Sequence, residues 1–436
     1  MVAAGCLLLA GCGLFGKDKL IIDGDRIPVL ESNDTIAPDY SAGDIKIVLP
    51  DPMLNYDWNQ SGGNSRHYGI YAETEEELAQ KWSASFGEGK SARDFLLASP
   101  VMTDSFIVTM DADAKVTFFD SFTGEELWSR RLKPQLRDDK EISLKGVGLA
   151  LDPETVFAVT GFGGIFAISR ESNRIKWEHF TKTPIRIAPT LDYEHKKLFV
   201  QTIDNTVIAL DSQTGDELWR YSAPGEETTL VGGASPAYDH YHDVLVAGFS
   251  NGELRAIKAS TGTPLWGDYL VPSNRNRSLA DINTIRANPV IDGGVVYAVG
   301  NNNLLVAIDL RSGKRIWERE IGSYNQPVVI GNYMFLLTNN ASLLALDAKS
   351  GKIIWETKVP AGNDIKDKVG VSYAGPILTS GRLLVTTSNG YVFYISPFTG
   401  EILGFIKLKH GSSLSPIVAD GKVVITTDNA EILVYE

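Results

Sequence analysis

Seven of the eight tryptophans recur at a nearly constant interval, and this spacing limits the folds that the chain can adopt. An eighth equivalent position, Gly404, extends the series, and neighbouring positions lie about 46 residues apart. A repeat of this length is typical of solenoids and propellers, in which each repeat is one supersecondary unit that cannot bury its apolar face alone. The tryptophans of the series are Trp82, Trp128, Trp177, Trp219, Trp266, Trp317 and Trp355.

The residues before each tryptophan follow a shared pattern, as in Asp211-Ser-Gln-Thr-Gly215-Asp-Glu-Leu-Trp219. The position of Gly215 is glycine in most copies and Asn173 in one. Glycine and asparagine adopt positive φ at the least cost, and the oxygens of Asp, Ser and Thr can bond the backbone of a turn. The pattern therefore predicts a tight turn between two strands, with a left-handed residue at this position.

Each repeat also contains three apolar segments before the turn. A proline opens the first segment, as at Pro289, and β-branched or aliphatic runs follow it at Val295–Val299 and Leu304–Ile308. Proline is tolerated at the first residue of a strand, where no ladder donor is needed. With the tryptophan strand, each repeat holds four short strands, which is typical of a β-propeller blade.

Eight such first strands can be counted, with Gly148-Leu149 in place of the proline in one of them. The final copy runs from Ser415 to Glu436 and has only three strands, while Glu77 to Phe86 holds a tryptophan strand with no partners of its own. Joining the two completes an eighth blade and leaves no open sheet edge. We therefore predict an all-β fold: a single eight-bladed β-propeller of four-stranded blades, closed by an N-terminal strand that completes the last blade.

The repeated tryptophans are interpreted as structural. A buried indole contributes up to roughly 5 kcal/mol before entropy is counted. A ligand cage is seldom repeated around a whole ring, so seven copies at one position favour packing between blades.

The N-terminus carries both cysteines, Cys6 and Cys12. The folded part of the chain therefore has no disulfide, thiolate metal site or cysteine nucleophile. The apolar run Val2–Ala10 is too short to span a bilayer, and Leu9-Ala10-Gly11-Cys12 resembles the lipobox of bacterial lipoproteins. This resemblance implies a signal segment over residues 1–12, lipidation at Cys12 and a lipid-anchored protein at the periplasmic face of the outer membrane.

The remaining chain divides into two parts. Residues 13–55 are rich in Asp and Pro and contain no repeat strand, so a flexible tether is expected there. Residues 56–436 are assigned to the propeller, with Trp58 as an anchor that packs on the ring. The formal net charge of −13 disfavours nucleic-acid binding.

Three copies of the repeat share the motif Ala-x-Asp-x-x-Ser/Thr-Gly-x-x-x-Trp, at Ala209–Trp219, Ala307–Trp317 and Ala345–Trp355. The motif resembles the tryptophan-docking motif of quinoprotein (PQQ-like) eight-bladed propellers, and the match covers about Trp82 to Glu436. Two kinds of protein share it: pyrroloquinoline-quinone (PQQ) dehydrogenases, and the BamB family of outer-membrane lipoproteins. With a lipobox and no second domain, the chain looks like the BamB family.

The resemblance to BamB implies a non-catalytic scaffold of the β-barrel assembly (Bam) machinery. Such a scaffold binds the periplasmic (POTRA) domains of BamA together with other Bam subunits and unfolded outer-membrane proteins, and it assists their folding and insertion. No catalytic residue, cofactor or metal is expected on this interpretation.

Two alternatives stay open. One is a PQQ-dependent dehydrogenase-like quinoprotein, a family in which adjacent cysteines form a disulfide against the quinone and a Ca²⁺ ion lies beside it. No cysteine follows Cys12 and no oxygen-rich calcium loop stands out, which disfavours this interpretation. The other is a propeller that binds a cell-wall polymer, because propeller channels are adaptable.

The connectors between blades are the candidate partner-binding segments. A connector from one outer strand to the next inner strand lies on one face of a propeller, and its length is free to vary. The longest of these connectors runs from Trp266 to Pro289, and the one before it runs from Trp219 to Pro236. Because the two blades are consecutive, these loops are expected to form one continuous patch.

The resemblance points to the same loops. In the BamB family the contact with BamA looks to be carried by a Leu-x-Leu-Arg-Gly stretch and an Asp-x-Asp stretch. Leu230, Gly232 and Asp281 match these stretches, whereas Val231 replaces the arginine and Asn283 the second aspartate, and Arg275, Arg277 or Arg286 is a candidate substitute for that arginine. The implied partner-binding residues are Leu230, Val231, Gly232, Asp281, Asn283 and Arg286.

Overall fold

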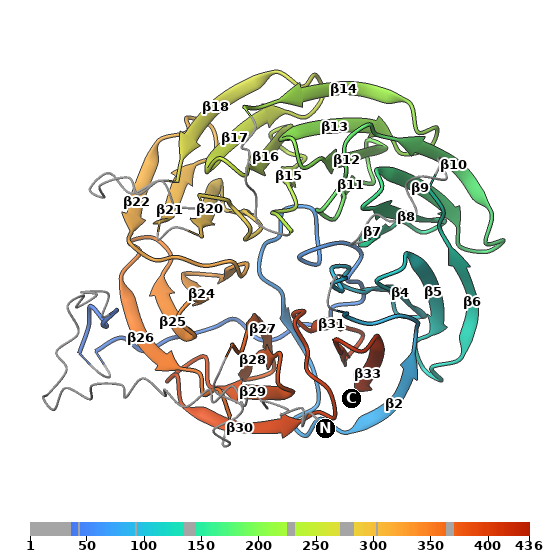
Figure 1. Ribbon diagram of the computed structural model, residues 1–436. Helices are drawn as coiled ribbons and strands as arrows, with labels where there is room; N and C mark the ends of the chain where they lie inside the picture. The colour runs from blue at the N-terminus through green and yellow to red at the C-terminus, as the bar shows by residue number, and fades with distance from the viewer. Residues whose placement is uncertain are drawn as a thin grey trace, which may run out of the picture. The chain divides into compact units, whose positions relative to one another are not determined.

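Strands are the only regular elements in the part of the chain that the structure describes. This computed structural model describes residues 36–41, 44–91, 94–134, 145–224, 232–270, 283–301, 304–362 and 370–436. In these ranges there is no helix long and apolar enough to cross a membrane. The strands form eight sheets arranged in a ring (Figure 1), and the prediction of an eight-bladed β-propeller is confirmed.

Each of the first four blades is an antiparallel meander whose strands follow one another from the inner to the outer position. Blade 1 contains β3 (Val101–Met102), β4 (Phe106–Met110), β5 (Lys115–Asp120) and β6 (Glu126–Arg131). Blade 2 contains β7 (Gly146–Leu151), β8 (Thr155–Thr160), β9 (Gly164–Ser169) and β10 (Ile175–Phe180). Blade 3 contains β11 (Thr190–Asp192), β12 (Lys197–Gln201), β13 (Thr206–Asp211) and β14 (Glu217–Ser222). Blade 4 contains β15 (Ala237–Asp239), β16 (Val244–Gly248), β17 (Glu253–Lys258) and β18 (Pro264–Tyr269).

The other four blades repeat this order, with one added strand in blade 7. Blade 5 contains β19 (Val290–Asp292), β20 (Val295–Gly300), β21 (Leu304–Asp309) and β22 (Arg315–Arg319). Blade 6 contains β23 (Val328–Ile330), β24 (Tyr333–Leu337), β25 (Ser342–Asp347) and β26 (Ile353–Lys358). Blade 7 contains β27 (Tyr373–Thr379), β28 (Arg382–Thr387), β29 (Tyr391–Ile395) and β30 (Ile402–Lys407), with β1 (Tyr71–Ala72) parallel to β27. Blade 8 contains β31 (Ile417–Ala419), β32 (Lys422–Thr426), β33 (Glu431–Tyr435) and β2 (Gln80–Ser85).

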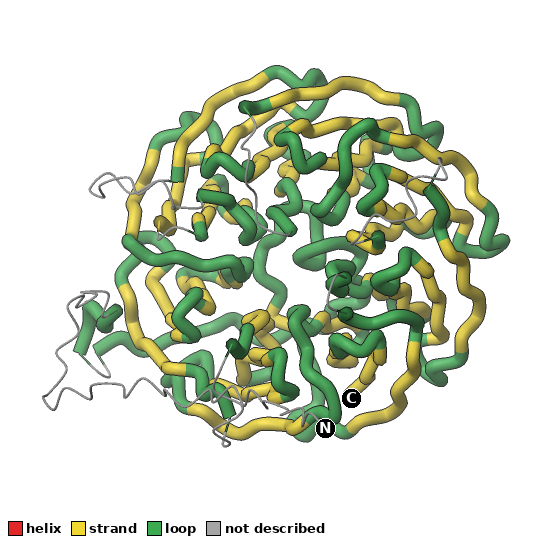
Figure 2. The backbone as a smooth tube through the Cα atoms, in the orientation of Figure 1, coloured by secondary structure: helices red, strands yellow, loops and turns green. Residues whose placement is uncertain are grey.

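The ring closes in blade 8, where the outer strand β2 pairs antiparallel with β33. Trp82 is opposite Val434, so this strand occupies the place that the tryptophan strand has in the other blades. Ala79 and Glu436 exchange two backbone hydrogen bonds of 3.0 and 3.1 Å beside the strand pair. The expected closure by an N-terminal strand is present (Figure 2).

The turn before each outer strand has the predicted backbone conformation. Its glycine has φ between +69° and +79° in six blades, and Asn173 has φ +53° in the seventh. The Asp211 carboxylate accepts hydrogen bonds from the backbone N–H groups of Gln213 and Thr214, at 2.8 and 3.0 Å. The side chain therefore stabilises the turn that reverses the chain between β13 and β14.

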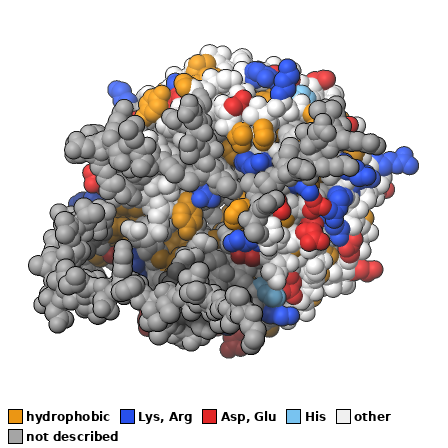
Figure 3. Space-filling view, viewed as in Figure 1, with side chains coloured by type: hydrophobic (Ala, Val, Ile, Leu, Met, Phe, Trp, Pro, Cys, Tyr) orange, Lys and Arg blue, Asp and Glu red, His pale blue; other side chains and the backbone are white. Residues whose placement is uncertain are grey.

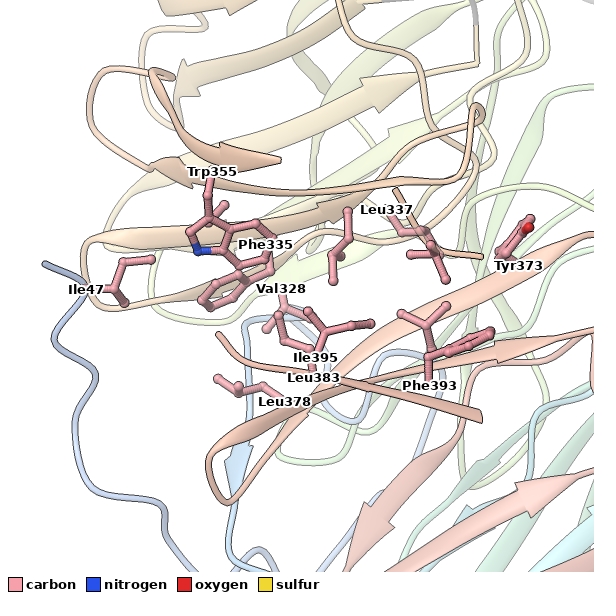
Figure 4. Packing of buried hydrophobic residues seen from close by; sticks show 14 of the residues in the cluster. Ile47, Val328, Phe335, Leu337, Trp355, Tyr373, Leu378, Leu383, Phe393 and Ile395 are labelled. Carbon is pink, nitrogen blue, oxygen red and sulfur yellow. The ribbon is translucent and has the colours of Figure 1, made fainter. Parts of the chain in front are cut away.

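Each tryptophan of the series packs on the turn of the next blade. A Cβ atom built on Gly262 would lie 2.8 Å from the indole of Trp219, and five other turn glycines meet a tryptophan in the same way. Each indole Nε1 also donates a hydrogen bond of 2.7–3.2 Å to a carbonyl of the next blade. Between blades 6 and 7 the indole of Trp355 lies among Phe335 and other buried apolar side chains (Figure 4).

A register shift in the outer strand precedes every tryptophan position. In blade 3, Ala209 is opposite Trp219 and Leu210 is opposite Glu217, so Leu218 has no partner. Such a bulge turns the extra side chain away from its neighbours. The bulged side chains are about half exposed in five blades: Leu127, Leu218, Leu265, Ile316 and Leu403.

The described residues that precede the ring pack against it. The backbone N–H of Asp39 donates to Ile353 O at 2.8 Å, and the Val48 N–H lies 3.3 Å from the Tyr333 hydroxyl. Ile47 is only 3% exposed, in the core cluster that also contains Ile354 and Trp355. Within the range predicted as a flexible tether, Tyr40, Ile45, Ile47 and Leu49 therefore pack against blades 6 and 7, whereas Val48 and Met53 are exposed.

A second segment, residues Asn55–Ala72, lies at the centre of the ring (Figure 1), and we call it the inner belt. It contacts the inner strand of every blade in the order of the ring. Trp58, the expected anchor, is 6% exposed and exchanges two hydrogen bonds of 2.8 Å with Met102. One residue of the belt contacts each blade in turn: Asn55 (blade 8), Trp58 (blade 1), Asn59 (blade 2), Gln60 (blade 3), Ser65 (blade 4), Arg66 (blade 5), Gly69 (blade 6) and Tyr71 (blade 7).

The chain just before the belt pairs with the end of the belt. The backbone N–H of Met53 donates to Tyr71 O, and the Glu73 N–H donates to Met53 O, each at 2.9 Å. The belt is therefore a complete circuit whose main-chain groups pair with seven sheets, while the side chain of Gln60 bonds Leu191 of blade 3.

One histidine of the belt, His67, is fully buried. Its Nδ1 lies 2.9 Å from the carbonyl oxygen of Pro289, and since a carbonyl only accepts, Nδ1 carries the proton. The Nε2 atom is buried with no hydrogen-bond partner. Burial lowers the pKa of His67 to about 4, and the ring is neutral in the folded protein.

We expect Gly262→Ala to destabilise the protein more than Gly331→Ala. Both glycines have positive φ, but a Cβ at Gly331 meets nothing within 4 Å, whereas at Gly262 it would displace the Trp219 indole. The conformational cost is about 1 kcal/mol in both variants, and the displaced indole adds roughly 1–3 kcal/mol in Gly262→Ala. Urea unfolding of the two variants measures the difference, and equal losses would contradict the docking role of the turn.

The second prediction concerns acid stability. Because the folded-state pKa of His67 lies below the unfolded-state value of about 6.5, the unfolded chain binds the proton more readily. The stability contributed by neutral His67 is complete above pH 6.5 and is lost, by roughly 3 kcal/mol, as the pH falls toward 4. His67→Gln should therefore flatten this part of the pH profile of unfolding free energy. His410→Gln, whose side chain borders solvent, serves as the control, and parallel profiles for wild type and His67→Gln would refute the assignment.

Candidate partner-binding face and central cavity

The predicted partner-binding residues precede the inner strands of blades 4 and 5. Gly232 comes shortly before β15, while Asn283 and Arg286 come before β19. Asn283 and Arg286 are half-buried. The other predicted site residues, namely Cys12, Leu230, Val231 and Asp281, lie outside the described residues.

The fold brings Gly232 and Arg286 together from consecutive blades. Gly232 has φ +82°, and a Cβ built on it would lie 3.6 Å from Nη2 of Arg286. The Arg286 guanidinium lies over the ring of Tyr324, 5.5 Å from its centroid. Burial lowers the pKa of Arg286, although a guanidinium keeps its proton at any physiological pH.

These residues also line a central cavity of about 720 Å³. The inner belt forms part of its wall, through residues such as Trp58 and Ile70, and the segments before the inner strands form the rest. In seven blades the residue three positions before the strand-opening proline lines the cavity: Leu97, Arg186, Gly233, Arg286, Tyr324, Tyr373 and Ser413.

Sequence analysis missed this ring of residues and, with it, Arg186. The signal that could have identified these residues is their constant position, three residues before the strand-opening proline. It was obscured because the seven residues belong to five different types, so that no single residue type marks the position. Arg186 Nη1 donates to the carbonyl oxygens of Gly161 and Ile185, each at 3.0 Å, and burial lowers its pKa.

The charged side chains of the cavity wall all have the same sign. They are Lys90, Arg186 and Arg286, and no Asp or Glu occurs among the described residues that line the cavity. Lys90 is paired with Asp428 at 3.8 Å. Hydrophobic and basic side chains lie next to each other near the middle of the face seen in Figure 3. The chain is acidic overall, yet its central cavity is basic.

Hydrogen bonds hold the belt against the cavity wall. The Asn288 amide nitrogen donates to Ser61 Oγ at 3.0 Å and to Gln326 Oε1 at 2.9 Å, and Gln326 Nε2 donates to His67 O at 3.1 Å. The Ser235 N–H donates to Asn288 Oδ1 at 2.7 Å. This network joins blades 4, 5 and 6 to the belt, so the wall beside Arg286 is fixed by several bonds.

The donor set does not fit the calcium and quinone of a PQQ dehydrogenase. Calcium in proteins takes six to eight oxygen ligands, several of them carboxylates, and the described cavity wall offers no carboxylate. The part of the chain that the structure describes has no cysteine for a disulfide against a quinone. In those residues no group of three His, Cys, Asp or Glu side chains is placed to hold a metal ion.

Comparison with known proteins covers most of the chain. The family described as outer membrane protein assembly factor BamB matches residues 112–357, more than half of the sequence. BamB of Shewanella oneidensis is 25% identical over 349 residues, which cover 79% of this chain and 85% of that protein. BamB of Escherichia coli K12 is also 25% identical, over 348 residues, with the same coverage of both chains.

Solved structures share the fold. The crystal structure of BamB from Moraxella catarrhalis matches with a TM-score of 0.69 at 15% identity, covering 83% of this chain and all of that one. Quinohemoprotein alcohol dehydrogenase from Comamonas testosteroni matches with a TM-score of 0.67 at 14% identity, covering 87% of this chain and 80% of that one. The structural likeness therefore extends to both kinds of protein, whereas the family model and the sequence relatives named above are BamB. On that evidence the chain belongs to the BamB family of outer membrane protein assembly factors.

Proposed function

We propose that this protein is a non-catalytic scaffold subunit of the Bam machinery and that it holds the periplasmic POTRA domains of BamA on the face formed by the connectors before blades 4 and 5. Family membership is the observation that carries the proposal, because the relatives are named as outer membrane protein assembly factors. Its task on this view is to bring partners together and so assist outer-membrane protein folding and insertion.

The contact between Gly232 and Arg286 supports this choice of face. The sequence has Val231 where the resemblance implies an arginine, and the guanidinium of Arg286 lies beside the next residue, Gly232. An arginine there offers a planar fork of donors that valine lacks, and a carboxylate of the partner can accept two bonds from it. Arg286 is therefore proposed as the substitute for the missing arginine.

The outer surface offers a second type of contact, with unfolded outer-membrane proteins. The bulged residues Leu218, Leu265 and Ile316 are 48–52% exposed on outer strands whose free edges are able to pair with an extended segment. Blade 6 is the exception, because its bulged residue Ile354 is only 8% exposed in a cluster against which residues of the N-terminal segment pack. In blade 6, a segment of the same chain thus packs at the outer strand, as an unfolded outer-membrane protein is proposed to do on the other blades.

Attachment to the membrane is proposed to depend on the lipidated Cys12. A single acyl chain gives only marginal binding, whereas two or more chains anchor a protein stably. The anchor would keep the propeller at the periplasmic face of the outer membrane, within reach of its partners.

The partner-binding face is tested by Leu230→Asp. A carboxylate placed in an apolar contact is desolvated without a partner, and we expect recovery of BamA by affinity capture from solubilised membranes to fall at least tenfold. The matched control is Leu218→Asp, which makes the same substitution at an exposed outer-strand position. Equal recovery of BamA with both variants would remove this face from the proposal.

Lipidation is tested separately by Cys12→Ser. The variant is expected to lose its acyl chains and to move from the membrane fraction to the soluble periplasmic fraction, as followed by fractionation and labelling with palmitate. A protein that remains in the outer membrane without label would show that something other than Cys12 anchors it.

A further inference from the structure

The central cavity has the size and composition of a small-molecule site. Ligand cavities in proteins span roughly 300–1,000 Å³ and are mostly apolar with a few placed polar groups. This cavity has about 720 Å³, and its wall combines apolar side chains such as Leu149, Ile187 and Leu414 with the two arginines. Most of this lining is separate from the connector residues to which the BamA contact is assigned.

The positive charge of the cavity wall favours a negatively charged ligand. Arg286 is paired with an aromatic ring and not with a carboxylate: its guanidinium lies over Tyr324, and no described Asp or Glu forms an ion pair with it. Arg186, which precedes β11 of blade 3, also lines the cavity, but its Nη1 is bonded to the carbonyl oxygens of Ile185 and of Gly161 in blade 2, so the ligand is assigned to Arg286. Positive charge that is partly desolvated, on a wall whose described residues include no acid, favours an anion.

Two glycines of blade 4 belong to the cavity wall between the segments that carry the two arginines. Blade 4 lies between blades 3 and 5, and it contributes Gly232 and Gly233 to the wall. Gly233 is in contact with Ile187, so that a Cβ there would lie 2.6 Å from that side chain, and Gly232 borders Arg286. Since neither glycine has a side chain, Ile187 and Arg286 can approach the backbone of blade 4. The Ser415 hydroxyl of the same wall is buried without a hydrogen-bond partner.

We propose that the central cavity binds a small organic acid, whose carboxylate lies at Arg286 and whose apolar body packs against the belt and the inner strands. The carboxylate accepts charge-assisted hydrogen bonds from the guanidinium group, and the apolar body contacts side chains such as Trp58 and Ile70. This site goes beyond the scaffold function and does not depend on it.

The test compares two probes with the same body and different charge. Isothermal titration calorimetry of the full chain with 2-naphthoate is expected to show one saturable site, and the neutral isostere 2-naphthamide should bind at least tenfold more weakly. Arg286→Gln should weaken naphthoate binding about tenfold and leave naphthamide binding unchanged. Arg286→Lys keeps the charge but loses the planar fork over Tyr324, so it should weaken naphthoate binding less than Arg286→Gln does.

The control is Arg220→Gln, which removes an exposed arginine that is ion-paired with Glu217 on the outer strand of blade 3. It should leave the binding of both probes unchanged. Equal affinity for naphthoate and naphthamide, or equal naphthoate affinity in Arg286→Gln and Arg220→Gln, would overturn the proposal. Circular dichroism of each variant shows whether a loss of binding reflects unfolding. Because the readout is binding of a small molecule, it is independent of BamA capture and separates the two proposals.

Discussion

The ring is held together by the contact between an indole of one blade and a turn glycine of the next. Gly262 illustrates the double requirement, since the turn needs positive φ and the indole of Trp219 occupies the space that a Cβ would fill. The eighth junction lacks both partners. Gly404 stands in the tryptophan position of blade 7, and the turn that would receive an indole is absent from blade 8, because β33 and β2 come from distant parts of the chain. Within blade 8, backbone bonds between Ala79 and Glu436 extend the pairing of β2 with β33.

The inner belt adds a second set of contacts at the opposite end of each sheet. The tryptophans join neighbouring blades at the outer strands, whereas the belt contacts all eight inner strands, and Met53, just before the belt, pairs with Tyr71 near its end. These contacts are chiefly backbone hydrogen bonds, which depend on position and only weakly on residue type. Every blade is therefore fixed at its outer and inner strand, and the cavity between the inner strands has a defined wall.

The repeat architecture could be predicted because each blade repeats one chemical requirement at a fixed interval, such as the left-handed residue at Gly215. The belt and the segment before it could not, since they occur once and bond through main-chain groups or bury isolated aliphatic residues such as Ile47. At the candidate site, the approach of Gly232 and Arg286 followed from the adjacency of blades 4 and 5. Arg186 could not be predicted, because the equivalent position, which is Arg286 in blade 5, holds leucine, glycine, tyrosine or serine in other blades.

The pairing of β2 with β33 joins residues about 350 positions apart, which is a long separation for a contact that completes a sheet. During synthesis β2 is made early, and its partner β33 is made last. Until then its backbone groups are exposed, and the same is true of the belt, whose eight acceptor sheets form one after another. Until β33 has been made, the new chain can therefore pair with the wrong strand, and the length of this period depends on the rate of synthesis.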